Sequence, residues 1–284
     1  MKKIIACIDG ARHTLAVCDY AIWASQHLNI PIDFLHVLDS HPEKSSIVDL
    51  SGSIGFDAHD MLLSQLSELD EQRSKLAQSH GKNILGVARK RAIAAGLTAV
   101  EMRQRHGSLT QSLLDLQGEA RMIILGQHEQ AKGAHRSYFD HHVEKIVRSV
   151  DLPVLVVSES FRAPGRFLVA FDGSDTARKM VQRLAGSALL ADLQCHVLYV
   201  GEDSERVREH MSWVRSALTA MQFEPIVSVL DGEPEALIVD YILSNNIDLL
   251  AMGAYGHSRI RELIVGSLTT TLLRTSPVPV LIMR

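Results

Sequence analysis

Two short stretches of the sequence decide the fold: "KKIIACIDG" (2–10) and "GRFLVAFDGSD" (165–175). Each is an apolar run that ends in Asp-Gly, and they lie in opposite halves of the chain. Three further pairs of strand-like segments match in the same order. They are "IDFLHVLDS" (32–40) with "LQCHVLYVGED" (193–203), "ARMIILG" (120–126) with "IDLLAMG" (247–253), and "SVDLPVLVVS" (149–158) with "TSPVPVLIMR" (275–284). Four matched pairs in one order indicate an internal duplication.

Amphipathic segments lie between these strands. Residues 14–28 and 177–191 place apolar side chains three and four positions apart, which predicts helices. The strands are apolar almost throughout, as in parallel sheets that helices cover on both faces. We therefore predict an α/β fold of two tandem doubly wound domains, each a mostly parallel sheet of about five strands flanked by helices. The Pro- and Gly-bearing stretch 159–165 separates them, with the domains at 1–160 and 165–284.

Composition restricts the classes of partner and compartment. The net charge of −4 gives no electrostatic reason to expect nucleic acid. No stretch approaches the roughly 18 to 20 apolar residues of a membrane span, so we expect no membrane partner. Cys7, Cys18 and Cys195 are odd in number and unclustered, which predicts a reducing compartment and a cytoplasmic location.

The N-terminal half is the longer one, because residues 41–82 follow its second strand as an insertion. The first part is polar and bears glycine, and from Met61 the pattern becomes helical. Two interpretations stay open: a surface excursion with a lengthened helix, or a lid or partner-docking element.

The glycine-punctuated stretch "MGAYGHSRIRELIVGS" (252–267) follows the fourth expected strand of the C-terminal half. Ligands of open parallel sheets bind beyond the carboxyl ends of the strands, where Gly253 lies. Gly266 and Ser267 then open a helical pattern, and a helix start suits phosphate. The stretch is either a phosphate cradle, with hydroxyls of Ser267, Thr269 and Thr270 nearby, or a loop that glycines merely shape.

These residues resemble the universal stress protein family, in a tandem form with two such domains in one chain. Nucleotide-binding members of the family carry Gly, two residues, Gly, nine residues, Gly and then Ser or Thr. Gly253, Gly256, Gly266 and Ser267 match that spacing without deviation. The resemblance implies an adenine nucleotide alpha hydrolase-like fold and ATP binding in the C-terminal half. ADP or AMP in place of ATP, and Mg²⁺ accompanying ATP, stay open as alternatives.

The same resemblance implies the remaining site residues. Asp172 occupies the position of the family's strand-end Asp beside adenine and ribose, and Val200 that of an apolar residue against adenine. A turn-forming Asp-Gly and a core valine are the plainer interpretations. Pro234 fits the first turn of a helix, in a structural role. The expected cofactor-binding residues are Ala170, Phe171, Asp172, Val200, Met252, Gly253, Tyr255, Gly256, Gly266, Ser267, Leu268 and Thr269.

The N-terminal half lacks this motif beyond Gly126. Glu129 stands where Gly256 lies in the other half, and Asp140 with His141 replaces the Gly-Ser pair. We therefore expect no ATP there. The segment also carries four histidines, at 128, 135, 141 and 142, but adjacent helical histidines point apart and no His-x-x-x-His pair occurs. We expect no metal site.

Three classes of function are compatible with these patterns. The first is a nucleotide-responsive regulator or binding protein in stress adaptation, as the resemblance implies, read by an unknown protein partner. The second is a slow ATPase, disfavoured because no general base or metal-binding carboxylate is evident beside the phosphates; we expect no catalytic residue. The third is an interaction scaffold with a structural nucleotide. Apolar edge strands need covering, so segments 152–158 and 278–284 should pair in an internal pseudo-dimer, and a homodimer of whole chains is a further expectation.

Overall fold

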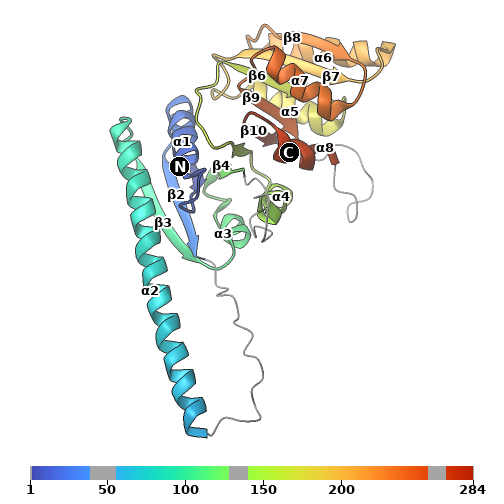
Figure 1. Ribbon diagram of the computed structural model, residues 1–284. Helices are drawn as coiled ribbons and strands as arrows, with labels where there is room; N and C mark the ends of the chain where they lie inside the picture. The colour runs from blue at the N-terminus through green and yellow to red at the C-terminus, as the bar shows by residue number, and fades with distance from the viewer. Residues whose placement is uncertain (1, 39–55, 128–139, 255–266, 284) are drawn as a thin grey trace.

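The computed structural model describes residues 2–38, 56–127, 140–254 and 267–283 (Figure 1). In this part of the chain ten strands form one sheet, in the order β3-β2-β1-β4-β5-β10-β9-β6-β7-β8. The first five strands belong to the N-terminal half and the last five to the C-terminal half. Each half repeats the order 3-2-1-4-5 with parallel neighbours, so the predicted α/β duplication is confirmed.

The elements of the two halves follow one another in the same sequence. The N-terminal half comprises β1 (Lys3–Cys7), α1 (Thr14–Leu28), β2 (Ile32–Leu38), α2 (Phe56–Ala94), β3 (Val100–His106), α3 (Leu109–Leu116), β4 (Ala120–Gly126), α4 (Asp140–Ser149) and β5 (Val154–Val157). The C-terminal half comprises β6 (Arg166–Ala170), α5 (Asp175–Ala185), β7 (Gln194–Val200), α6 (Glu205–Thr219), β8 (Ile226–Leu230), α7 (Pro234–Ser244), β9 (Leu249–Gly253), α8 (Ser267–Thr275) and β10 (Val280–Met283).

The two halves join edge to edge through β5 and β10. These strands pair antiparallel, with Leu155 opposite Leu281 and Val156 opposite Val280. The predicted contact between segments 152–158 and 278–284 is therefore confirmed. Gln127 Nε2 also donates to the carbonyl of Leu273 at 2.7 Å, which ties the end of β4 to α8. Because the junction is antiparallel, the carboxyl ends of the strands in the two halves point in opposite directions.

Helices cover both faces of the sheet, and alternate strand residues feed two cores. Ile4 on β1 packs into the core under α1, α2, α5 and α6, whereas its neighbour Ile5 packs into the core under α3, α4, α7 and α8. This two-sided burial explains why the strands are apolar at nearly every position. No helix in the described ranges is long and apolar enough to span a membrane.

Two helix boundaries differ from the sequence-based expectation. The inserted helix α2 begins at Phe56, five positions before Met61. α5 ends at Ala185 rather than Ala191, because Gly186 follows it at the C-cap and glycine is about 1 kcal/mol less favourable than alanine inside a helix. Turns then carry Leu189 and Leu190 into the core, which explains their helix-like apolar spacing.

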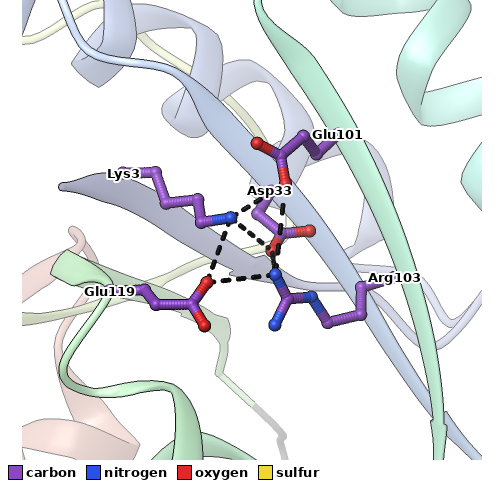
Figure 2. Close-up of polar contacts among 5 residues, drawn as sticks. All are labelled: Lys3, Asp33, Glu101, Arg103 and Glu119. Atoms are coloured by element: carbon purple, nitrogen blue, oxygen red, sulfur yellow. Dashed lines mark hydrogen bonds and ion pairs between the residues drawn. The ribbon is translucent and has the colours of Figure 1, made fainter. Parts of the chain in front are cut away.

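A cluster of five charged residues fastens the amino-terminal ends of the strands in the N-terminal half (Figure 2). Lys3 Nζ lies 2.8 Å from Glu101 Oε2, 3.2 Å from Glu119 Oε2 and 3.5 Å from Asp33 Oδ2. Arg103 Nη2 lies 3.0 Å from the same Asp33 oxygen. Burial raises the pKa of Asp33, and the charges of Arg103 and Lys3 offset this only in part. The cluster joins β1, β2 and β3 near their amino ends. Ligands of such sheets bind at the carboxyl ends, so the cluster lies away from the candidate pocket of its own half.

Candidate functional site

A pocket of about 270 Å³ opens at the carboxyl edge of the C-terminal sheet. It lies where β6 separates β7 from β9, the point at which the strand order reverses and open α/β sheets bind their ligands. Its walls come from three strands and from the starts of α5, α7 and α8. The lining residues are Ala170, Phe171, Asp172, Ser174, Ala177, Leu198, Tyr199, Val200, Pro234, Ile238, Met252, Gly253, Leu268 and Thr269.

Asp172 places a carboxylate in this pocket at the end of β6. Its Oδ1 accepts a hydrogen bond from the Ser174 amide at 3.0 Å, across Gly173 in the left-handed region (φ +76°). Ser174 is in turn the N-cap of α5 and accepts from the Ala177 amide at 3.1 Å. The turn therefore fixes the carboxylate through one oxygen. Within the described ranges the other oxygen, Oδ2, has no hydrogen-bond partner and is open to a donor.

Gly253 lets the end of β9 approach the first turn of α5. A Cβ atom at this position would lie 3.4 Å from Thr176 Cγ2 and 3.7 Å from the Ala177 amide nitrogen. A longer side chain would therefore project into the space between the two elements. Glycine keeps backbone groups accessible there, as close approach of a ligand requires.

Aromatic packing holds one wall of the pocket in place. Phe171 is 3% exposed, and its ring lies nearly parallel to that of Trp213 on α6, with centroids 6.4 Å apart. The Arg178 guanidinium lies 4.7 Å above the Trp213 ring, within cation–π range. These contacts link α5 and α6 behind the strand end that carries Asp172.

The far side of the pocket comes from α8, which begins at Ser267. Leu268 and the buried Thr269 line the cavity in its first turn. Thr270 Oγ1 is also buried, with no hydrogen-bond partner in the described ranges. Tyr255, Gly256 and Gly266 lie outside the described residues, as does the side chain of Ser267.

The structure thus brings together, around one pocket, those predicted site residues whose side chains or backbone it describes. Eight of them line the one pocket: Ala170, Phe171, Asp172, Val200, Met252, Gly253, Leu268 and Thr269. The sequence interpretation missed the side chains between them, which are Ser174, Ala177, Leu198, Tyr199 and Ile238, and it assigned Pro234 to structure alone. Pro234 does occupy the first turn of α7, and it also lines the pocket. A signal was present for Ser174, because an N-cap serine two residues after Asp172 must lie beside it.

The corresponding pocket of the N-terminal half is much smaller, about 60 Å³. Asp9 keeps the strand-end position and accepts from the Ala11 amide at 2.8 Å. His13, buried at 6% exposure, stands where Thr176 stands in the other half. Its Cβ lies 2.6 Å from the position that a Cβ would take on Gly126, so the end of β4 and the start of α1 lie in close contact. The N-terminal pocket is therefore narrowed, and this half also lacks the glycine motif. Glu129, which stands where the other half has Gly256, lies outside the described residues.

Neither reactive thiols nor a metal cluster appear beside these pockets in the part of the chain that the structure describes. Burial, with the Asp33 and Asp9 carboxylates, raises the pKa of the Cys7 thiol, so it stays protonated at neutral pH. No group of three His, Cys, Asp or Glu residues could hold a metal ion in the described ranges. His128 and His135 lie outside them, and the side chains of His141 and His142 are not described.

Known proteins are similar to this chain in both sequence and fold. The model of the universal stress protein family matches residues 1–158 and 202–284. The chain belongs to the universal stress protein family. It is 37% identical over 287 residues to "Universal stress protein Slr1230" of Synechocystis sp., and the match covers all of both chains. A universal stress protein structure from Archaeoglobus fulgidus has the same fold, with a TM-score of 0.67, 18% identity and coverage of 99% of this chain and 98% of that one.

The family match leaves a gap at residues 159–201 of this universal stress protein. That gap contains β6, α5 and β7, and hence Asp172 and Val200 of the candidate site. The sheet order shows that these elements occupy the places of β1, α1 and β2, so the second repeat has the same strands as the first. "Stress response protein NhaX" of Bacillus subtilis is similar to a shorter part, 27% identical over 96 residues that are 34% of this chain and 57% of that protein.

Proposed function

We propose that this universal stress protein binds ATP in the pocket of its C-terminal half, residues 165–284. The observation that carries the proposal is the convergence of Asp172, Gly253 and Thr269 on one cavity at the strand-order reversal. Asp172 Oδ2 is an acceptor for the sugar or base, and apolar Val200 and Met252 suit the adenine ring. A cavity of about 270 Å³ is close to the lower limit of ligand pockets, about 300 Å³.

The phosphates belong at the other end of this pocket. The first turn of α8 offers backbone N–H groups and the positive end of the helix dipole, which favour anions. Gly253 allows the backbone of β9 to approach them closely. Gly256, Gly266 and Ser267 complete the cradle in this proposal, with Tyr255 beside them. ADP or AMP would occupy the same pocket with fewer of these phosphate contacts.

One chain binds one nucleotide in this account. His13 and Gly126 close the N-terminal pocket to about 60 Å³, too little for an adenosine group. Glu129, placed by sequence at the motif's second glycine, adds repulsion toward a polyphosphate. The N-terminal half, residues 1–160, therefore supports the assembly without binding ATP itself.

The protein acts as a nucleotide-responsive binding protein in stress adaptation, in the cytoplasm, and a partner reads its occupancy. Asp172 is the one carboxylate among the described lining residues, and in this proposal it contacts the adenosine. No described side chain of the pocket is thus positioned as a general base for an attacking water at the phosphates. Slow hydrolysis and a purely structural nucleotide are the competing functions.

Purification followed by identification of the bound small molecule tests this function. The expected result is an adenine nucleotide retained with the full chain and, on incubation with excess ATP, no steady release of phosphate. The Gly266→Val variant is the control, because it should lose the nucleotide while remaining folded. Steady phosphate release that this variant abolishes would establish the ATPase instead. A chain that retains no nucleotide and binds none on titration would contradict the proposal.

A further inference from the structure

Helix α2 extends well beyond the sheet that its C-terminal part covers (Figure 1). Contact with the sheet begins near Gln78, whose carbonyl accepts from Gln104 Nε2 at 3.2 Å, and continues through the buried Leu85 and Ala88. The described side chains before that point, residues 65–77, are exposed apart from the half-buried Leu66. We call residues 65–77 the α2 arm.

The α2 arm carries large apolar side chains along one face. Leu66, Leu69, Arg73 and Leu76 follow one another at intervals of three and four residues, the spacing of a coiled-coil seam. Leu69 is 51% exposed and Leu76 is 70% exposed. Burial of apolar side chains away from water is favourable, so a seam of exposed leucines on an isolated helix favours association with another helix.

Charge is divided along the same helix. Residues 65–72 carry three carboxylates and no cation, whereas residues 73–83 carry three cations and no carboxylate. The carboxylates are Glu68, Asp70 and Glu71, and the cations are Arg73, Lys75 and Lys82. Within the arm one ion pair forms, between Lys75 Nζ and Glu71 Oε1 at 2.7 Å, where the acidic segment meets the basic one. A second copy of this helix, running antiparallel, would set the acidic segment of each against the basic segment of the other.

The internal pairing of the two halves uses the two matched apolar edge strands. β5 and β10 already cover each other within the chain, so this pair of matched edges is not available to a second chain. We propose that two copies of the chain pair through their α2 arms as an antiparallel helix pair.

One register satisfies both the seam and the charges. It sets Leu66 opposite the second copy's Leu76 and Leu69 opposite the second copy's Arg73, as an antiparallel seam requires. Arg73 and Lys75 then lie beside residues 67–69 of the other arm, in its acidic segment. Parallel pairing would instead place like charges side by side, which disfavours it. The polar Arg73 within the seam fixes this alignment.

The test measures the mass of the full chain in solution by sedimentation at rising protein concentration. Wild type should reach twice the chain mass of 31.4 kDa. The double variant Leu69→Gln with Leu76→Gln should remain monomeric, with circular dichroism checking that the helix persists. The matched control is Leu15→Gln with Leu243→Gln, since these side chains are similarly exposed (53% and 61%) on α1 and α7; it should dimerise like wild type. A wild type that stays monomeric, or an arm variant that still dimerises, would overturn the proposal.

Charge reversal tests the antiparallel arrangement separately. Arg73→Glu with Lys75→Glu makes the arm acidic throughout, and Glu68→Lys with Asp70→Lys and Glu71→Lys makes it basic. Each variant alone should lose self-association, because its two arms would repel. Mixing the two should restore a species of twice the chain mass, weakened by added salt. Dimers formed by each variant alone, or a mixture that stays monomeric, would overturn the antiparallel pairing.

Discussion

Replacing Asp172 with alanine is the sharpest test of how the pocket holds a nucleotide, because the chain contains its own control. Asp172 and Asp9 end equivalent strands and make the same turn contact, to the amide two residues on, at 3.0 and 2.8 Å. Only Asp172 lies in the larger pocket. Its loss removes a charged acceptor for the adenosine, and hydrogen bonds to charged groups contribute about 1.5 to 3 kcal/mol. ATP affinity should therefore fall about 10- to 100-fold, since 1.4 kcal/mol corresponds to a factor of ten.

Asp9→Ala should leave ATP affinity unchanged while costing at least as much stability. Asp9 Oδ1 also accepts from Thr14 Oγ1 at 3.2 Å, so Asp9→Ala breaks at least two hydrogen bonds where Asp172→Ala breaks the turn bond to Ser174. Calorimetric titration gives the affinities and chemical unfolding gives the stabilities. Equal loss of affinity in both variants would show that turn stability, and not ligand contact, controls binding. Undiminished affinity in Asp172→Ala would refute the assignment of this carboxylate to the nucleotide.

The remaining predictions concern the cradle, the charged cluster and a buried histidine. Gly266→Val should abolish ATP binding without unfolding the chain, because the side chain would block the start of α8; unchanged affinity in titration would contradict the cradle. Lys3→Met should lower the free energy of unfolding by about 1 to 3 kcal/mol, because it leaves Asp33 buried beside Arg103 alone. ATP affinity should hold, because the cluster lies on β1 to β3 of the N-terminal half, and β4, β5, β10 and β9 separate it from β6. Burial, with the Arg166 charge, lowers the pKa of His196, so below its ordinary value near 6.5 the unfolded chain takes up a proton that the folded chain does not. Stability is thus lost as the pH falls below about 6.5 toward that lowered pKa. Urea unfolding of wild type should show a larger loss between neutral and mildly acidic pH than His196→Gln, and equal losses would show that this histidine does not contribute.

The order of strands and the join between the halves could be predicted from the sequence because they rest on patterns repeated twice. Four matched apolar runs gave the duplication, and the edge pair β5–β10 followed from two apolar strands that needed cover. The ends of helices were less predictable. The apolar spacing of Leu189 and Leu190 looked helical, yet their burial comes from turns after Gly186.

Residues of the candidate site were predictable where backbone direction decides their place. Asp172 and Gly253 end neighbouring parallel strands, so they had to meet at one edge. Tyr199 and Ile238 were missed because their approach depends on how far α7 stands from β7, which no local pattern records. The closure of the N-terminal pocket by His13 against Gly126 depends likewise on the spacing of α1 and β4.

Photolabelling of the intact chain with an azido derivative of ATP, followed by mapping of the modified peptides, tests the location of the nucleotide most directly. We expect labelled peptides from residues 170–200 and 252–269, with labelling abolished by excess ATP and by Gly266→Val. Peptides from residues 3–157 should remain unlabelled. Competable labelling of the strand ends around Asp9 and Gly126 would contradict it, because the nucleotide would then occupy the half whose pocket His13 closes.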